Sequence, residues 1–437
     1  MSALEPLRHI FPRTAQATPE GHLAIGGCDV VDLAGQFGTP LYIFDEATLR
    51  HQCRAFRDAF HAVYPNSLVI YACKAYINPV LARIFQEEGL GLDVVSGGEL
   101  AVARAVEFPP DRIYFHGNNK TPQELQDALD YRIGRVVVDN FQELALLEHL
   151  AGQRGIRQPI LLRITPGVDP HTHAYTTTGV VDSKFGFPLE GERAREAVGR
   201  ARASPHLALK GLHFHLGSPI FEVEPYVQAI AIAVDFAVQS GAPLEEFSPG
   251  GGFAIAYTRE QTPPSPADYA RAIATALREA CARHRLPLPR LIVEPGRAIV
   301  GPSAIALYRV GVVKEIPGIR TYVAVDGGMG DNIRPALYGA RYEAVCATKL
   351  LQPPTTTVTI AGKYCESGDI LVRDALLPPV EPGDLIALPA AGAYCPSMAS
   401  TYNLNGRPAI VLVSNGSARL IRRRETPQDL MALDVFP

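Results

Sequence analysis

Residues 135–150 read RVVVDNFQELALLEHL, a β-branched run followed directly by a stretch rich in Leu, Ala and Glu. The run RVVVDN starts with consecutive apolar residues and shows no alternation, which is typical of a strand buried on both faces. In FQELALLEHL the apolar residues recur at the i, i+3, i+4 spacing of a helix that covers one face of a sheet. The stretch therefore predicts one strand–helix unit of a parallel sheet.

The same unit recurs along much of the chain. Helix-like stretches such as VLARIFQEE (80–88) and PQELQDALD (122–130) separate the strand-like runs. Eight such units are the number found in a (β/α)8 barrel. A doubly wound sheet is the alternative, but it usually has fewer strands and a glycine fingerprint after the first one, where this chain has YACK. The eight runs are residues 67–72, 89–96, 112–117, 135–140, 159–165, 209–215, 245–252 and 291–296.

After residue 308 the sequence changes to strand-like runs separated by Pro/Gly turns, which is typical of an all-β domain. The segment HLAIGGCDVVDLA (22–34) predicts a further strand of that domain, before the chain enters the barrel. We therefore expect an α/β fold with two parts. They are a TIM-like (β/α)8 barrel at residues 45–308, and a second all-β domain built from the N-terminal segment 1–44 and residues 309–437.

Composition and charge exclude several classes of function. The chain has 437 residues, a formal net charge of −4 and 20% charged residues, so nothing favours binding to nucleic acid or to an anionic membrane. No apolar run is long enough to span a bilayer, and the N-terminus lacks the layout of a signal peptide. Seven cysteines without paired spacing indicate reduced thiols. These features predict a cytoplasmic enzyme.

Polar residues follow nearly every apolar run. Because barrel enzymes carry their catalytic groups at the carboxyl ends of the strands, we interpret this ring as a functional site. The residues at or just past the runs are Lys74, Asp93, Ser96, Gly117, Asn118, Asp139, Asn140, Arg163, His215, Ser218, Gly250, Gly251, Gly252, Glu294 and Arg297.

Four features of this ring together describe a pyridoxal phosphate site. A lysine at a strand end is most often a solvated charge, but Lys74 is also placed to attack an aldehyde and form a Schiff base. The glycine triplet 250–252 stands where backbone N–H groups commonly bind phosphate. His215 could stack on a planar ring, and Glu294 could hold a ring nitrogen protonated. In such a site the cofactor accepts the electrons of a carbanion.

The histidine pair HFH allows a different interpretation. His213 and His215 share one face of a strand and could bind a metal, which would indicate a metal-dependent barrel hydrolase. No other obvious ligand set surrounds the pair, and HTH at 171–173 falls in a long loop. No metal ion is therefore expected, and metal analysis of the pure protein would decide between the two sites.

Motifs spread over nearly the whole chain carry a resemblance to a known family. They are YACKA, DVVSGGEL, FHGNNKT, HTHAYTTTGVVDSKFGF, GLHFHLGS, GGGF, EPGRAIVG, VDGGMGDNIRPALYGA, CESGDI and GAYCPSM. On these motifs the chain resembles the fold type III, or alanine racemase-fold, decarboxylases that depend on pyridoxal 5'-phosphate. The chain departs from the family pattern after HLGS, where Pro219 replaces the usual glutamine and removes a backbone donor.

The resemblance implies cofactor-binding roles for residues of the barrel. Lys74 would form the Schiff base, Glu294 would pair with the pyridine nitrogen, and the imidazole of His215 would stack on the ring. Asp93 is expected among the cofactor-binding residues as well. The phosphate would be bound by Ser218, Gly251, Gly252 and Tyr394.

The resemblance also implies a substrate site and a homodimer. Arg297, Arg334 and Tyr338 would hold a distal carboxylate of the substrate, with Tyr394 also in contact. Glu366 would lie near the distal amino group, and Cys365 would be the general acid. In the family, the last two residues reach the site from the neighbouring subunit, so a homodimer is expected as the minimal active unit.

The expected reaction is the decarboxylation of meso-2,6-diaminopimelate to L-lysine and CO2. Two arginine forks suit a distal carboxylate, whereas substrates that end in a cation require an acidic pocket. A related decarboxylase for carboxynorspermidine, ornithine or arginine is the alternative. A catalytically inactive family member with a binding role is a further one, against which Lys74, Glu294 and Cys365 argue.

Overall fold

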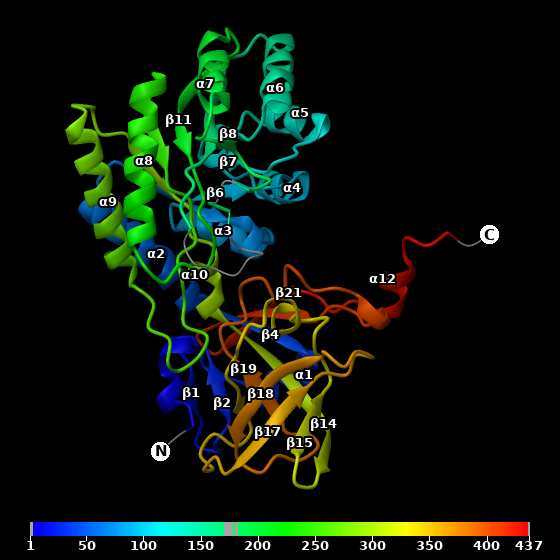
Figure 1. Cartoon of the computed structure of the whole chain (residues 1–437). Coiled ribbons are helices and arrows are strands. Elements are labelled where there is room, and N and C mark those ends of the chain that lie inside the picture. The colour runs from blue at the N-terminus through cyan, green and yellow to red at the C-terminus, as the bar shows by residue number, and fades with distance from the viewer. Residues whose placement is uncertain (1–2, 170–177, 180–181, 436–437) are drawn as a thin grey trace. The chain divides into compact units, whose positions relative to one another are not determined.

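The computed structural model describes residues 3–169, 178–179 and 182–435, and the chain divides into two compact units. The barrel unit comprises Cys53–Ala254 and Pro263–Arg297. The β unit comprises the described residues up to Gln52, the segment Ile255–Thr262 and the residues from Ala298 onward. Figure 1 shows the helices and strands of both units. The boundaries expected at residues 44 and 308 stay a prediction.

Eight parallel strands form a closed barrel, which confirms the predicted fold class. Each strand pairs with the next, and the ring closes because the first strand pairs with the last. In chain order they are β5 (Ser67–Ala72), β6 (Gly91–Val94), β7 (Ile113–Phe115), β8 (Arg135–Val138), β9 (Gln158–Thr165), β11 (Leu207–His213), β12 (Glu246–Ser248) and β13 (Arg290–Val293).

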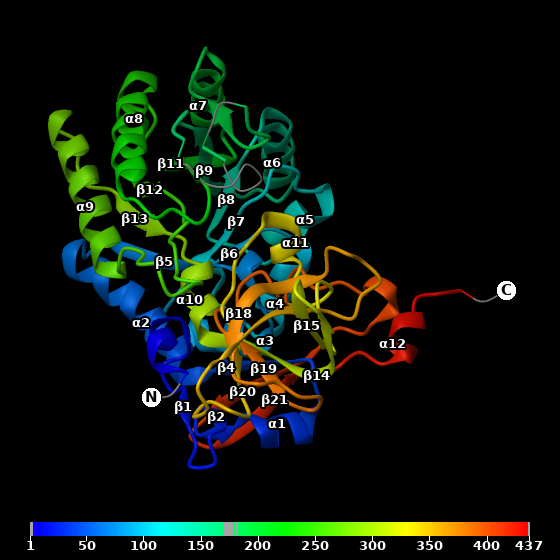
Figure 2. The same ribbon diagram turned by 60° about the horizontal axis from the view of Figure 1, so that its bottom comes forward.

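Helices cover the outside of these strands, as Figure 2 shows for α6 to α9. The amphipathic stretch that follows β8 forms α6 and buries Leu144, Leu147 and Leu150. A short strand, β10 (Phe187–Pro188), extends the sheet beside β9. The helices are α2 (Glu46–Val63), α3 (Pro79–Glu87), α4 (Gly97–Ala105), α5 (Pro122–Asp130), α6 (Phe141–Gln153), α7 (Arg193–Ala203), α8 (Glu224–Ser240) and α9 (Pro266–Arg283).

Two residues of the polar ring cap helices. The Ser96 hydroxyl accepts a hydrogen bond from the backbone N–H of Glu99 and begins α4. The Asn140 side chain accepts one from the N–H of Glu143 and begins α6. Because an N-cap satisfies a donor that the helix leaves unpaired, these two polar side chains are explained by the fold.

A buried ion pair joins the end of β7 to α6. The Lys120 ammonium donates to Glu143 Oε1 and to the carbonyl oxygens of Gly117 and Val137, each at 2.8 Å. Both side chains are almost fully buried. The three acceptors match the three N–H donors of a lysine, so the charge is fully hydrogen-bonded.

Lys120→Met is therefore expected to lower the free energy of unfolding by about 3–5 kcal/mol, because it leaves a buried carboxylate without its partner. Urea unfolding followed by circular dichroism measures the change. The double variant Lys120→Met/Glu143→Gln should recover part of the loss, since it removes both charges. Lys210→Met breaks the exposed pair with Glu245 and should cost at most about 1 kcal/mol. Equal losses in the Lys120 and Lys210 variants would contradict a special role for the buried pair.

The β unit contains a long mixed sheet, one inner strand of which comes from the N-terminal part of the chain. Strand β4 lies between β14 and β20, with Leu41 opposite both Leu307 and Ala409. The sheet order is β18-β17-β15-β14-β4-β20-β21, and β19 pairs with β14 and β16. The strands are β4 (Leu41–Asp45), β14 (Ala304–Ile316), β15 (Arg320–Val325), β16 (Val345–Cys346), β17 (Thr356–Ala361), β18 (Ile370–Leu377), β19 (Leu385–Leu388), β20 (Ala409–Ser414) and β21 (Ser417–Arg422).

The segment 22–34, predicted to add a strand to the β domain, contributes strands to a separate sheet and not to this long one. Those residues form β2 (Leu23–Ile25) and β3 (Cys28–Asp29) of a separate three-stranded sheet with β1 (Gln16–Ala17). Helix α1 (Val30–Phe37) then begins, because the Asp29 carboxylate caps the N–H of Val31. The cap ends the strand after two residues, and LYIFD supplies the strand of the main sheet instead.

The β unit also contains α11 (Arg334–Tyr338) and α12 (Pro427–Met431), and α10 (Arg297–Val300) starts at the last residue of the barrel unit. Among the described residues, no helix has the length and hydropathy needed to cross a membrane.

Candidate active site

Four ionisable side chains meet inside the barrel at the carboxyl ends of its strands. Glu294 follows β13, and its Oε2 lies 3.2 Å from Nε2 of His213 at the end of β11. Its Oε1 accepts a hydrogen bond of 2.7 Å from the Ser248 hydroxyl at the end of β12. His116 follows β7, and its Nε2 lies 3.6 Å from Glu294 Oε1 and 3.6 Å from Asp93 Oδ1. All five side chains are buried.

The pKa values of the two carboxyl groups of this cluster shift in opposite directions. Burial and the neighbouring Glu294 raise the pKa of Asp93 well above its usual value. Burial opposes ionisation of Glu294 too, but His213, His116 and the Ser248 hydroxyl outweigh it and hold the pKa of Glu294 below its usual range. The cluster therefore keeps a negative charge on Glu294.

Burial lowers the pKa of His213 and lowers that of His116 well below its usual value. Several buried polar atoms at this end of the barrel have no hydrogen-bond partner among the described residues. They are Asp93 Oδ1, His116 Nε2, Asp139 Oδ1 and His213 Nδ1. Unpartnered buried groups are costly, so a site with four of them is built for a polar ligand.

Lys74 lies at the same end of the barrel, in a 3-10 turn (Cys73–Ala75) directly after β5. Its charge favours ionisation of Asp93 and contributes, after burial, to a pKa of His215 well below the usual value. Burial raises the pKa of Glu99 to about 7, against the opposing effect of Lys74. Lys74 is exposed in this structure.

At the glycine triplet, residues 250–252, the main chain packs closely against the main chain of neighbouring segments. A Cβ on Gly250 would lie 2.5 Å from the Phe214 carbonyl oxygen, and one on Gly251 would clash with the carbonyl oxygen of Glu294. Gly250 and Gly252 have φ angles of +76° and +102°, which glycine adopts without strain. Side chains are thereby excluded, and the backbone of this turn can approach a ligand closely.

The predicted phosphate-binding residues of the barrel lie around this turn. The N–H of Gly251 donates to Nδ1 of His215 at 3.3 Å, so the imidazole is fixed against the turn. The Ser218 hydroxyl accepts a hydrogen bond of 3.1 Å from Arg297 Nε. Pro219 follows Ser218 through a cis peptide bond. The structure thus places His215 against Gly251 and Arg297 against Ser218.

The sequence interpretation missed His116, Ser248 and the role of His213 beside Glu294. His116 stands inside the motif FHGNNKT, and its neighbours Gly117 and Asn118 were named in its place. His213 was considered only as a metal ligand with His215. Among the described residues, the group that could hold a metal is instead His116, His213 and Glu294, whose ligand atoms lie within 4.8 Å of one another. The HTH segment at 171–173 lies outside the described residues.

The other predicted site residues belong to the β unit. Arg334 is buried at the start of α11, and its Nη1 donates to the Tyr342 hydroxyl. Tyr338, the last residue of the same helix, is half-buried. Tyr394 has a φ of +62°. Cys365 and Glu366 are both exposed, and the N–H of Cys365 donates to Asn403 Oδ1 at 2.9 Å.

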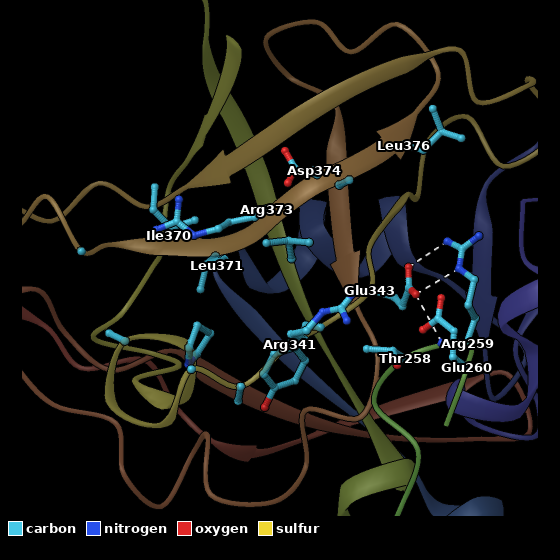
Figure 3. Close-up of a pocket in the computed structure, with 18 residues that line it drawn as sticks. Thr258, Arg259, Glu260, Arg341, Glu343, Ile370, Leu371, Arg373, Asp374 and Leu376 are labelled. Atoms are coloured by element: carbon cyan, nitrogen blue, oxygen red, sulfur yellow. Dashed lines mark hydrogen bonds and ion pairs between the residues drawn. The ribbon is translucent and has the colours of Figure 1, made fainter. Parts of the chain in front are cut away.

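The β unit also contains a cavity of about 810 Å³ beside α11 and β18. In Figure 3, Arg259 and Glu343 are joined by hydrogen bonds at one side of it, and Arg373 and Asp374 of β18 line another. The Arg259–Glu343 contacts are 2.8 and 3.0 Å long. Tyr342 lines this cavity as well.

A comparison with protein families gives the class of the chain. The family described as "Pyridoxal-dependent decarboxylase, pyridoxal binding domain" matches residues 46–301. The chain belongs to this family of pyridoxal-dependent decarboxylases.

Comparison with individual proteins shows which members of the family the chain is similar to. The chain is 47% identical to a diaminopimelate decarboxylase of Bacillus subtilis (strain 168), over 97% of each chain. It is 46% identical to a diaminopimelate decarboxylase of Synechocystis, over 99% of this chain and 94% of that one. A crystal structure of the M. jannaschii diaminopimelate decarboxylase with L-lysine superimposes with a TM-score of 0.91, at 35% identity and 98% coverage of both chains.

The barrel site fits pyridoxal 5'-phosphate. The anionic Glu294 suits a protonated ring nitrogen, and the unpartnered polar atoms around it suit the other polar groups of a pyridine ring. The glycine turn offers a backbone cradle from which any Cβ is excluded, as a phosphate requires. The cluster of His116, His213 and Glu294 is thus explained as part of a cofactor site, and this explanation requires no metal ion.

Proposed function

We propose that the protein converts meso-2,6-diaminopimelate to L-lysine and CO2, the last step of lysine biosynthesis. One observation carries this choice of substrate within the family. Arg334 is a buried guanidinium, and no carboxylate pairs with it among the described residues. A buried charge is stable only with a partner, so Arg334 calls for an anion from the ligand. Diaminopimelate brings a second carboxylate, whereas ornithine and arginine end in a cation.

In this proposal the barrel residues hold the cofactor and control its charge. Lys74 would hold the aldehyde group of the cofactor, and His215, fixed by the Gly251 N–H, would contact its ring. Glu294, which is ionised, would keep a proton on the ring nitrogen. The bound cofactor supplies the electron sink for the carbanion that remains when CO2 leaves. Asp93 completes the cofactor site, and the phosphate is bound by Ser218, Gly251, Gly252 and Tyr394.

The substrate is held by a different set of side chains. Arg334, Arg297 and Tyr338 bind the distal carboxylate, because a guanidinium presents two parallel N–H groups to a carboxylate. Tyr394 contacts the substrate, and Glu366 accepts from the distal amino group. Cys365 would supply the proton that replaces CO2.

We also propose that the active protein is a cytoplasmic homodimer in which Cys365 and Glu366 serve the partner's site. Both residues are exposed in the single chain, which supports a role at a surface shared with a second copy. All seven cysteines are free thiols, which supports a reducing compartment. Mixing inactive Lys74→Ala and Cys365→Ala chains tests the dimer. Half of the dimers would be mixed and hold one intact site each, restoring about a quarter of wild-type turnover; no recovery would overturn shared sites.

Cys365→Ala is expected to lower kcat by about 10²–10⁴-fold, because a general acid contributes about that much. The visible absorbance of the bound cofactor should stay unchanged, since Cys365 does not hold the ring. Stopped CO2-release assays and a spectrum of the same sample measure both. Cys281→Ala, a buried thiol in α9, is the control and should keep wild-type kcat. Wild-type turnover by Cys365→Ala would remove its role as acid.

The proposed substrate is tested by a panel of amino acids. The purified protein is loaded with pyridoxal phosphate and incubated with diaminopimelate, ornithine, arginine or carboxynorspermidine. CO2 release and L-lysine are measured. We expect turnover of diaminopimelate with the highest kcat/KM. A higher kcat/KM for any other substrate would replace diaminopimelate, and no CO2 from any of them would refute a decarboxylase.

A further inference from the structure

Two tyrosines of the β unit enclose the guanidinium of Arg334. The Cζ atom of Arg334 lies 4.5 Å from the ring centre of Tyr257 and 5.5 Å from that of Tyr342. The two rings meet edge to face, with centres 5.3 Å apart and planes at 78°. Both tyrosines are buried. A cation over an aromatic face is attracted to it, most strongly where water is excluded.

The Tyr342 hydroxyl fixes the rotation of the guanidinium as well as its position. It accepts a hydrogen bond from Arg334 Nη1, and it also lies 3.4 Å from Cys395 Sγ. Either the hydroxyl or the thiol can be the donor in this second contact, and in both cases it restrains the Tyr342 hydroxyl further. Burial raises the pKa of Tyr342 well above its usual value, so it remains a neutral phenol.

These contacts fix the position of the Arg334 guanidinium, but they do not neutralise its positive charge. Among the described residues, Tyr342 is the one side-chain acceptor of its guanidinium. The remaining N–H groups keep their full capacity for a carboxylate. An arginine that is already oriented loses less rotamer freedom when a ligand binds, so the carboxylate is bound more tightly.

We propose that Tyr342, together with the ring of Tyr257, is the positioning residue that orients Arg334 and thereby selects substrates with a second carboxylate. This inference rests on the proposed function. Tyr342 acts through Arg334, so its loss should weaken binding of the distal carboxylate and leave the chemistry at the barrel unchanged.

Tyr342→Phe tests the proposal, because it keeps the ring and removes only the hydroxyl. For the protein loaded with pyridoxal phosphate, KM for diaminopimelate should rise about tenfold, the effect of one lost hydrogen bond to a charged group, while kcat stays within about twofold. The control is Tyr308→Phe. Tyr308 is also a buried tyrosine of the β unit, and its hydroxyl has no partner among the described residues. This control should match the wild type.

A binding measurement separates positioning from general damage to the β unit. L-Lysine retains the distal carboxylate, whereas cadaverine is the same diamine without it. Tyr342→Phe should weaken L-lysine binding about tenfold and leave the affinity for cadaverine unchanged. Equal weakening of both ligands, or wild-type binding and KM in Tyr342→Phe, would overturn the proposal. A wild-type protein that releases no CO2 from diaminopimelate would refute the proposed function, while the ratio of the two affinities would still decide the role of Tyr342.

Discussion

Replacing Lys74 by alanine is expected to abolish CO2 release and to remove the visible absorbance of the lysine-bound cofactor. Lys74 lies directly after β5, and its charge acts on Asp93 and His215, so it stands at the same end of the barrel as the buried Glu294 cluster. Lys120, another lysine near the carboxyl ends of the strands, is occupied by three acceptors and cannot replace it. Loss of a covalent attachment point should lower kcat by at least about a thousandfold.

Two further variants make this test specific. Lys74→Arg keeps a positive charge but cannot bond to an aldehyde, so it should be as inactive as Lys74→Ala and equally colourless. Lys210→Ala removes a lysine of β11 that pairs with Glu245 and should keep both turnover and colour. If Lys74→Ala retained its absorbance and its kcat, the assignment of the whole barrel site would be refuted.

Glu294→Gln is expected to lower kcat by about 10²–10³-fold while the cofactor remains bound and coloured. The amide keeps the shape of the side chain and can still contact Ser248 and His213. It carries no negative charge, and so it cannot stabilise a proton on the ring nitrogen. The variant therefore tests the charge of Glu294 independently of its hydrogen bonds. Steady-state kinetics and an absorbance spectrum of the same sample measure the result.

The matched control for this variant is Glu246→Gln. Glu246 is another buried glutamate of the barrel, but it forms a bidentate pair with Arg135 at the start of β12. Its replacement should lower the midpoint of thermal unfolding and leave kcat unchanged, because it leaves Arg135 without its partner. A fall in kcat of the same size in both variants would show that any lost buried carboxylate disables the protein.

The barrel could be predicted from the sequence because its signals are local. Each strand and the helix after it lie within a few residues of each other, as in residues 135–150, and each carries its own periodicity. The main sheet of the β unit depends instead on pairing between distant segments. HLAIG and LYIFD are similar short apolar runs, and only the partners β14 and β20 decide that the second one enters the sheet.

The site was predicted only in part, because some of its residues can be recognised only from contacts between distant segments. The rule that catalytic groups follow the strands found Asp93 and Glu294, but it also selected Ser96 and Asn140, which cap helices. His116 was missed because it becomes a site residue only through its distance to Asp93 and Glu294. The tyrosines around Arg334 could not be predicted either, since Tyr257 is distant from Arg334 in sequence.

The position of β4 within its sheet has a consequence for how the protein is made. As the ribosome extends the chain, every strand of the barrel can pair with one that has just emerged or emerges soon after. Strand β4 must wait for β14 on one edge and for β20 on the other, and β20 is among the last strands to be synthesised. Contacts of such long sequence separation form late. A nascent chain that stalls before Ala409 therefore exposes one edge of β4, and that edge is open to pairing with a neighbouring chain.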